Sequence, residues 1–273
     1  MKPPLVSIIV PTYNSSKFLE MCLKSVKNQT YGNIELIVAD NNSTDDTKAI
    51  ARKYTDKVFN KGPERSAQRN FGVSESTGEY VVIIDSDMKL SPQVIENCVR
   101  NIEENADNVG VVIPEESFGE GFWAQCKKLE RSFYIGVEWM EAARFFRKSV
   151  YQEAGGYDEV MISGEDWDLS QRIAKYGTIT RVNDLIFHNE GRISLYKTIK
   201  KKFYYAQKFA SYVAKNKDIG ATQNQIGLFG RYWLFLSQPV KLFRNPIRGL
   251  GVLFMKTCEF GFGGMGYLIG KMK

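Results

Sequence analysis

Short apolar segments alternate with longer amphipathic ones along roughly the first hundred residues of the chain. Four segments have the length and the aliphatic, β-branched composition of buried strands: residues 6–10, 34–39, 80–84 and 109–113. Between the first two, apolar residues recur at the spacing of one helix face: Leu19, Cys22, Leu23 and Val26. Ser16 is placed to cap this helix, and further helices are expected over residues 44–54 and 91–104. The alternation predicts an α/β fold with a mostly parallel, Rossmann-like sheet flanked by helices.

Polar turns follow three of the predicted strands. They are Pro11-Thr12-Tyr13-Asn14, Asp40-Asn41-Asn42-Ser43 and Asp85-Ser86-Asp87. Because ligands bind at the carboxyl ends of the strands in open sheets of this kind, we expect these turns to lie at a binding site. Neither the phosphate-loop motif nor the dinucleotide-binding fingerprint occurs in the sequence. A nucleotide would therefore bind through other groups, such as carboxylates and a metal.

Asp85 and Asp87 are the clearest candidates for a metal site. On an extended backbone, two carboxylates two residues apart point the same way and can hold a hard divalent cation. Such a cation would bridge the pyrophosphate of a nucleotide-linked substrate and stabilise the charge on the leaving group. His188, the chain's single histidine, would complete a mixed site suited to Mn²⁺ or Mg²⁺. The alternatives are an ordinary acidic turn and a structural histidine.

Two further charged pairs have both a functional and a structural interpretation. Arg65 and Arg69 lie four residues apart at a helix start, where they would meet phosphate or form a solvated basic face. Glu165 and Asp166 lie in the first turn of another predicted helix, where acidic side chains interact favourably with the helix dipole. The functional alternative is that one of these two carboxylates faces the binding site.

Seven short motifs occur in a fixed order along the chain. They are P-T-Y-N, D-N-N-S-T-D-D-T, G-P-E-R-S-A-Q-R-N, D-S-D, G-G-Y-D-E, G-E-D-W-D-L-S-Q-R and F-H-N-E. This set resembles the family-2 inverting glycosyltransferases, which have the A-type, nucleotide-sugar-binding fold. The resemblance covers about residues 5–192. Each motif is short, so the specificity of the resemblance comes from their order.

The resemblance implies a set of donor-binding residues. The donor would be a UDP- or GDP-linked sugar, with Asp40 at the edge of its base and the two arginines near its ribose or diphosphate. Trp167 would be a stacking platform for the sugar, with a core position as the alternative. The implied donor-binding residues are Pro11, Tyr13, Asn14, Asp40, Arg65, Arg69, Asp85, Glu165 and Trp167.

The resemblance also implies the metal ligands and the base. Asp87 would be the main protein ligand of Mn²⁺ or Mg²⁺, assisted by His188 and Asp85. Asp166 would be the general base that takes the proton from the acceptor hydroxyl as it attacks the anomeric carbon. A single displacement of this kind needs a base opposite the leaving group and a positive clamp on the diphosphate, and it inverts the anomeric centre.

Composition indicates the cellular compartment of the protein, and the charges are unevenly distributed along the chain. The chain has 273 residues, 43% of them hydrophobic and 25% charged, which indicates a globular protein with one main domain and an appendage. Four cysteines without metal-ligand spacing favour a reduced, cytoplasmic setting. Residues 1–190 carry 22 basic and 29 acidic side chains, whereas residues 191–273 carry 15 basic and 2 acidic ones. This basic tail predicts a polyanionic partner, either a membrane surface or nucleic acid.

The tail pattern favours lipid over nucleic acid. An apolar stripe from Leu195 to Val213, with lysines from Lys197 to Lys217, is typical of a helix on an anionic membrane, or of one packed on the catalytic domain with its lysines in water. Residues 226–243 and 247–270 are apolar but interrupted by charges, so interfacial or re-entrant helices are expected there. Seven glycines between Gly249 and Gly270 would allow close helix packing.

These features predict a catalytic domain over residues 1–192 and a membrane-associating helical region over residues 193–273. The expected activity is metal-assisted transfer of a sugar to a hydroxyl, with a polyprenyl-(di)phosphate-linked saccharide as acceptor, at the cytoplasmic face of the membrane. One alternative is a polyprenyl-phosphate sugar synthase, whose phosphate nucleophile needs no strong base. Another, of a different class, is a non-catalytic membrane-bound protein that binds nucleotide sugars.

Overall fold

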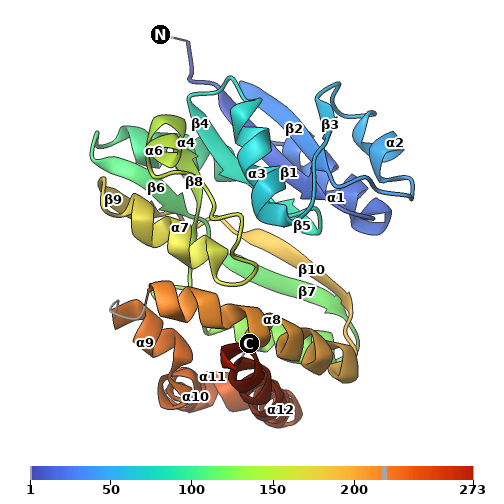
Figure 1. Cartoon of the computed structure of the whole chain (residues 1–273), viewed down its shortest axis with the longest axis vertical. Helices are drawn as coiled ribbons and strands as arrows, with labels where there is room; N and C mark the ends of the chain where they lie inside the picture. Colours follow the sequence, from blue (N-terminus) through green and yellow to red (C-terminus); the bar gives the residue numbers. More distant parts are fainter. Residues whose placement is uncertain (1, 217–219, 273) are drawn as a thin grey trace. The chain divides into compact units, whose positions relative to one another are not determined.

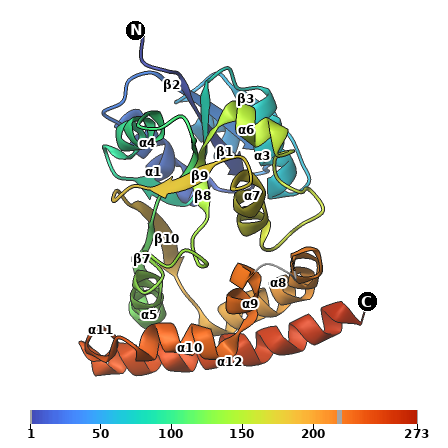
Figure 2. The same ribbon diagram turned by 90° about the vertical axis from the view of Figure 1, so that its left-hand side faces the viewer.

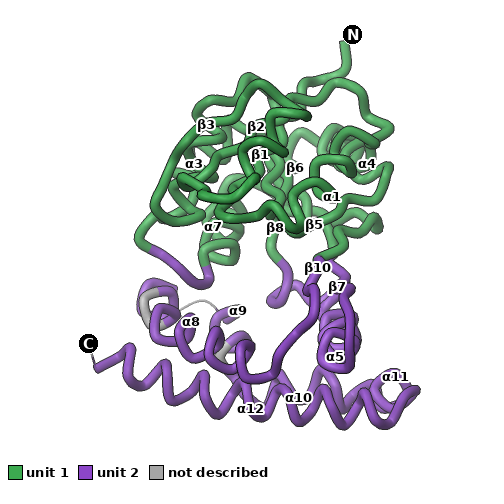
Figure 3. The backbone as a smooth tube through the Cα atoms, turned by 90° about the vertical axis from the view of Figure 1, so that its right-hand side faces the viewer, with its two compact units in different colours: residues 1–114, 142–160, 165–188 green, residues 115–141, 161–164, 189–273 purple. Residues whose placement is uncertain are grey.

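The computed structural model describes residues 2–216 and 220–272. Lys217, predicted to belong to the first tail helix, lies outside the described residues, as do the side chains of Ala210 and Ile226. The chain forms two compact units, shown in Figure 3. The first comprises residues 1–114, 142–160 and 165–188, and the second comprises residues 115–141, 161–164 and 189–273. The segment 115–141 thus belongs with the C-terminal residues rather than with the sheet that it interrupts.

The first unit is built on a seven-stranded sheet in the order β3-β2-β1-β4-β8-β6-β9. Pairing is parallel throughout except at β8, which runs antiparallel to β4 and β6. All four strands predicted from the sequence occur, and the predicted α/β class is confirmed. The strands are β1 (Val6–Thr12), β2 (Ile34–Asp40), β3 (Val58–Asn60), β4 (Tyr80–Ile83), β6 (Asn108–Val112), β8 (Ala143–Arg147) and β9 (Thr178–Arg181).

Helices cover both faces of this sheet (Figure 1). On one face, α1 and α4 pack through a core that contains the predicted stripe of α1; on the other, α3, α6 and α7 pack against alternate residues of β1 and β4. Because the central strands are covered on both sides, β1 and β4 are buried at every position, without the alternation of a half-exposed strand. These helices are α1 (Ser16–Lys27), α2 (Thr47–Ala51), α3 (Arg65–Ser74), α4 (Val94–Glu103), α6 (Lys148–Glu153) and α7 (Glu165–Ile173).

Three helix starts differ from the sequence-based prediction, and the helix predicted over residues 44–54 is confined to Thr47–Ala51. The N-cap of α1 is Ser15, and its side chain makes no capping bond. The carboxylate of Asp45, 29 residues away along the chain, instead accepts a hydrogen bond from the Ser16 amide at 3.1 Å. The distant Asp45 carboxylate therefore accepts the helix-start hydrogen bond that a serine side chain was expected to accept. The helix predicted from residue 91 begins at Val94, with Pro92 in the preceding turn.

A second sheet has three strands in the order β5-β10-β7. Its members are β5 (Met88–Leu90), β7 (Glu115–Glu120) and β10 (Ile186–Arg192). The antiparallel pairing of β5 with the first residues of β10 sets His188 opposite Met88. The chain's histidine is thereby fixed one residue away from the predicted metal turn, although the two lie a hundred residues apart in sequence.

The second unit is helical apart from β7 and the end of β10 (Figure 2). Its longest helix, α12, packs along α8, and the two approach closely where α12 carries glycines. A Cβ at Gly266 or Gly270 would collide with the backbone of α8, so the predicted role of tail glycines in close packing is confirmed at these two positions. The helices are α5 (Gly121–Ser132), α8 (Leu195–Lys215), α9 (Gly220–Ile226), α10 (Leu228–Leu236), α11 (Pro239–Phe243) and α12 (Pro246–Lys271).

The apolar stripe of α8 packs in part against α12. Phe203 and Ala206 lie at the glycine positions of α12, and the two expectations for this helix, a membrane surface or the catalytic domain, stay predictions. Its lysines are mostly exposed. Among the described residues, no helix meets the length and hydropathy expected of a membrane-crossing segment.

Candidate functional site

The predicted site residues gather at one end of the first unit's sheet. Thr12 and Asp40 face each other at the carboxyl ends of the parallel strands β1 and β2, and the Asp85 turn follows β4 on the other side of β1. The chain therefore places all three polar turns at the same edge, as the strand pattern predicts. Two helix starts, those of α3 and α7, bring Arg69 and Asp166 to the same place.

Asp40 is buried and fully engaged inside the protein. Its Oδ1 accepts hydrogen bonds from the Thr12 hydroxyl at 2.8 Å and the Ser43 hydroxyl at 2.6 Å, while its Oδ2 accepts from the Ser43 amide at 2.7 Å. These bonds shape the turn that carries the next residues. Asp40 is not exposed at all, so contact between its carboxylate and a base edge would require the surrounding turn to move, and that role stays a prediction.

Tyr13 is the exposed aromatic group of this edge. Its side chain is 61% exposed, directly after the buried Pro11 and Thr12. The neighbouring Asn14 has a positive φ of 46° and is held by Ser43 and Thr44, which fixes the turn below the ring. An open ring on a fixed backbone is a suitable surface for stacking a nucleobase.

Arg69 connects the acidic residues of the site. Its guanidinium is fully buried and ion-paired to three carboxylates: Nη2 to Asp85 Oδ1 at 2.8 Å, and Nη1 to Asp166 Oδ1 at 3.1 Å and Glu165 Oε1 at 3.3 Å. The Tyr157 ring lies 4.8 Å from it. The interpretation of Arg69 as part of a solvated basic face is therefore wrong. Its predicted contact with a diphosphate stays a prediction: carboxylates bind Nη1 and Nη2, while the buried Nε has no hydrogen-bond partner among the described residues.

Burial and charge act on these acids in opposite directions. Burial alone would raise the pKa of Asp85, but the guanidinium groups of Arg69, Arg144 and Arg65 outweigh it and hold that pKa below its usual range. Glu165 shows the reverse: burial and the neighbouring Asp166 charge raise its pKa despite the arginines. Arg65, roughly half exposed, reaches Glu165 at 3.4 Å.

The predicted three-ligand metal set is not assembled. Residues 85–87 form a turn, with the Met88 amide bonded to the Asp85 carbonyl, instead of the extended backbone that would aim both carboxylates alike. Asp85 consequently faces Arg69 and Arg144, whose Nη2 lies 3.6 Å from its Oδ2. Among residues 2–216 and 220–272, no group of three acidic, histidine or cysteine side chains is placed to hold a metal.

Asp87 and His188 nevertheless fit a cation as a pair. His188 Nε2 lies 3.3 Å from Asp87 Oδ2. The other oxygen, Asp87 Oδ1, is buried without a hydrogen-bond partner among the described residues. An orphaned carboxylate oxygen beside an imidazole nitrogen is the kind of donor set that Mn²⁺ accepts, with the remaining positions left to substrate oxygens and water.

Asp166 is hydrogen-bonded through only one of its two carboxylate oxygens. Its Oδ1 accepts from Arg69 and, at 2.9 Å, from the Tyr157 hydroxyl. The described residues offer no hydrogen bond to Oδ2, and the side chain is 30% exposed. The carboxylate is thus oriented through one oxygen while the other is open to a substrate hydroxyl. Trp167 beside it is half-buried, and its stacking role stays a prediction.

Two residues of this network were missed by sequence reasoning. Tyr157 lies in the G-G-Y-D-E motif, but its contact with Asp166 depends on how α7 packs. Arg144 is a buried charge within the short strand β8, next to Phe145 and Phe146. A buried charge in such a strand needs a partner, so Arg144 could have been flagged from the sequence even though the partner could not have been named.

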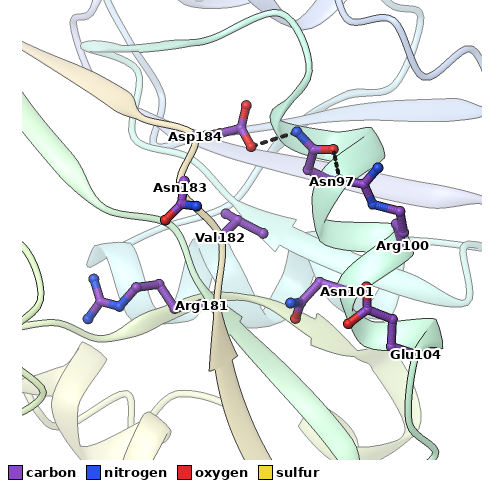
Figure 4. A pocket seen from close by; sticks show the side chains of 8 residues that line it. All are labelled: Asn97, Arg100, Asn101, Glu104, Arg181, Val182, Asn183 and Asp184. Atoms are coloured by element: carbon purple, nitrogen blue, oxygen red, sulfur yellow. Dashed lines mark hydrogen bonds between the residues drawn. The ribbon is translucent and has the colours of Figure 1, made fainter.

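A separate polar pocket lies between α4 and the segment 181–184 (Figure 4). In it, the Asn97 side chain donates to Asp184 and accepts from Arg100. None of the predicted site residues lines this pocket. It therefore adds nothing to the site at the strand ends.

Comparisons with known proteins agree with the geometry. A family model described as glycosyl transferase family 2 matches residues 7–157. A curated relative, the GalNAc(5)-diNAcBac-PP-undecaprenol beta-1,3-glucosyltransferase of Campylobacter jejuni, is 26% identical over 93% of this chain and 79% of its own length. Glycosyltransferase GlyG of Streptococcus pneumoniae is 35% identical over 38% of this chain, and the chain spans only 37% of it.

A solved structure shows the same fold over nearly the whole chain. The mannosyltransferase PcManGT from Pyrobaculum calidifontis, in complex with GDP-Man and Mn²⁺, has a TM-score of 0.64 at 18% identity and covers 98% of this chain and 84% of its own. At this identity the likeness concerns the fold alone.

Proposed function

Because the chain belongs to glycosyl transferase family 2 and is a glycosyltransferase by that membership, we propose that it moves a sugar from a nucleotide-sugar donor to a hydroxyl of a lipid-linked saccharide. The transfer is a single displacement with inversion, and Asp166 is the base. The observation that carries this proposal is the carboxylate of Asp166, held through Oδ1 and open at Oδ2.

The acceptor step follows from that geometry. Arg69 and Tyr157 hold Asp166 in one orientation, so Oδ2 can accept the proton of a hydroxyl without first being ordered. A phosphate nucleophile would need no such base. The oriented carboxylate therefore favours a hydroxyl acceptor over the phosphate acceptor of a polyprenyl-phosphate sugar synthase.

The donor side would be held by Tyr13, Asp87 and His188. Tyr13 offers its exposed ring to the base of a UDP or GDP group. Asp87 and His188 would hold Mn²⁺ or Mg²⁺, which supplies positive charge to the departing diphosphate. Support for a divalent cation and a GDP-linked donor comes from the mannosyltransferase of the same fold, whose complex contains GDP-Man and Mn²⁺.

The acceptor class rests on the relative from Campylobacter jejuni, whose name specifies an undecaprenol-PP-linked acceptor. A lipid-linked acceptor places the reaction at a membrane. The four cysteines are free, three of them buried, which supports a reducing compartment and hence the cytoplasmic face.

Asp166→Asn tests the assignment of the base. The substitution keeps an oxygen for Arg69 and Tyr157 but removes the charge that accepts the proton. We expect transfer to a lipid-linked saccharide to fall by about a thousandfold, the usual order for a general base, with the donor dissociation constant within about threefold by calorimetry. Asp87→Ala should abolish the response to Mn²⁺.

Three outcomes would contradict the proposal. Turnover of Asp166→Asn above about a tenth of the original would remove Asp166 from the chemistry. Undiminished transfer to a polyprenyl phosphate would favour the synthase alternative. A wild-type protein that binds donor but never consumes it with Mn²⁺, with either acceptor, would favour the non-catalytic alternative.

A further inference from the structure

The long helix α12 has its charges on the inside. Lys256 and Glu259 are the only acidic or basic residues between Arg248 and Lys271, and they are just 3% and 2% exposed. Lys256 Nζ contacts Glu259 at 2.6 Å and Glu130 of α5 at 2.9 Å. Charged residues are almost never fully buried unless they are paired, and here both are.

The outward side of the same helix is apolar. Large hydrophobic side chains recur on it at spacings of three, four or eleven residues, all close to whole helical turns, and are between 48% and 86% exposed: Ile247, Leu250, Phe254, Met265, Leu268 and Met272. The 22 residues from Gly249 to Gly270 correspond to about 33 Å of helix at 1.5 Å per residue. Helices of water-soluble proteins bury the apolar stripe and expose the charges. This helix also buries apolar residues, Val252 and Met255 among them, but it exposes a second apolar side and buries the two charges in its middle.

The preceding helices α10 and α11 add to this surface. Phe229 and Trp233 of α10 stack with ring centroids 6.0 Å apart and are 80% and 58% exposed. Tyr232 of α10 contacts Phe260 and Thr257 of α12, so the two helices are joined (Figure 2). We call the exposed apolar residues of α10, α11 and α12 the apolar face. Its other members are Leu228, Leu236, Val240, Phe243, Phe262 and Ile269.

The charges around the apolar face have one sign. Arg244 and Arg248 are exposed before α12 and at its start, and Lys271 is exposed at its end. The single acidic residue from position 219 onward is Glu259, which is buried. Anionic lipid head groups complement this basic rim, and acyl chains complement the apolar residues between its two ends.

We propose that the apolar face lies in the interfacial region of an anionic membrane, with α12 in the plane of the bilayer and its basic ends among the head groups. This arrangement is possible because the Lys256 and Glu259 side chains are buried within the protein. Either charge on the outer side of α12 would have to enter the acyl region. The occupant is thus lipid, and the contact is made by α10–α12 rather than by α8, which the sequence favoured.

Flotation of the full-length protein with vesicles tests this surface independently of the sugar-transfer activity. Wild type should float with vesicles of phosphatidylcholine and phosphatidylglycerol, and less with phosphatidylcholine alone or at high salt. The triple variant Leu250→Ser, Phe254→Ser, Leu268→Ser should partition at least a hundredfold more weakly, because each buried Leu or Phe contributes about tenfold or more.

The matched control changes exposed apolar residues of the first unit, Val160→Ser and Tyr176→Ser, and should bind like wild type. Circular dichroism of all variants shows whether they fold. A lipid brominated near the head group should quench the fluorescence of Trp233, and Trp233→Phe should remove that quenching.

Two results would overturn the proposal. One is a folded triple variant that floats like wild type. The other is a wild type that ignores vesicles but forms a dimer that the triple variant loses, because the apolar face would then be an interface between copies of the chain.

Discussion

Replacing Lys256 by methionine should destabilise the second unit strongly. Lys256 forms a buried charge cluster with Glu130, Glu259 and Lys127, in which the two lysines and the two glutamates balance. The Tyr134 hydroxyl donates to Glu130 as well. Methionine nearly fills the same volume, so the change removes the charge and little of the packing. It leaves two buried carboxylates with one partly exposed lysine.

The magnitude follows from the burial of both carboxylates. Removing one partner of a buried ion pair costs about 3–5 kcal/mol, because the charge left behind is uncompensated. Here both glutamates are almost fully buried and Lys127 still contacts them at 3.0 and 3.6 Å, so the lower end of that range, about 3 kcal/mol, is expected. A loss of that size is a large part of the stability of one unit.

Lowering the pH should reduce the difference in unfolding free energy between the wild type and Lys256→Met. Burial tends to raise the pKa of Glu130 and Glu259, but Lys127 and Lys256 outweigh it and hold both below the ordinary value. A lowered native pKa stabilises the fold above the unfolded-state value of about 4.3, and this contribution is lost as the pH falls through the native pKa. The wild type loses more of it than Lys256→Met, so the two should converge below about pH 4.

Hydrogen exchange of α5 and α12 is the suitable assay, because two units need not unfold together. The double variant Lys256→Met, Glu259→Gln restores the balance of charge and should recover more than half of the loss. An unchanged exchange rate in Lys256→Met at pH 7 would refute the reasoning, as would a double variant less stable than the single one.

Two further predictions test single contacts. Tyr157→Phe should lower kcat about tenfold with the KM for donor unchanged, because the Asp166 carboxylate loses a charge-assisted hydrogen bond. The control is Tyr151→Phe, an equally buried ring whose hydroxyl bonds to Asn70, and its kcat should stay within about twofold of the wild type. Equal effects of the two substitutions would show that Tyr157 has only a packing role. Gly266→Ala should destabilise α12 by more than about 1 kcal/mol because its Cβ meets the α8 backbone, while Gly264→Ala, with open space around its Cβ, should stabilise it by up to about 1 kcal/mol; thermal melting with the same sign for both would contradict the packing.

The first unit was largely predictable because its signals are local. Each of the four predicted strands is a near-continuous apolar run, with Ser7 and Glu35 as the polar exceptions, which is how strands covered on both faces appear in sequence. The same rule placed the three polar turns at one edge. Antiparallel β8 was not predicted because two of its five residues are the arginines Arg144 and Arg147. Strand β3 was not predicted because it has only three residues.

The site chemistry was less predictable because it depends on contacts between distant segments. Asp85 and Asp87 were expected to act together, but the turn between them sends one to Arg69 and the other to His188. In the tail, the sequence shows a stripe on α8 and an interrupted apolar stretch in α12. Only the partner Glu130, more than a hundred residues away, explains why the interruption by Lys256 is compatible with an apolar face.

The guanidinium of Arg69 has one further consequence. It donates at the same time to Asp85, on the side of the strand ends, and to Asp166, on the side open to a hydroxyl. Any ligand that displaces Asp85 from Arg69 changes the strength of the ion pair between that guanidinium and Asp166. Linkage is reciprocal, so the second ligand must change the affinity for the first by the same factor. Two substrates of this site are therefore expected to bind in a mutually dependent way, with one buried side chain as the physical connection between them.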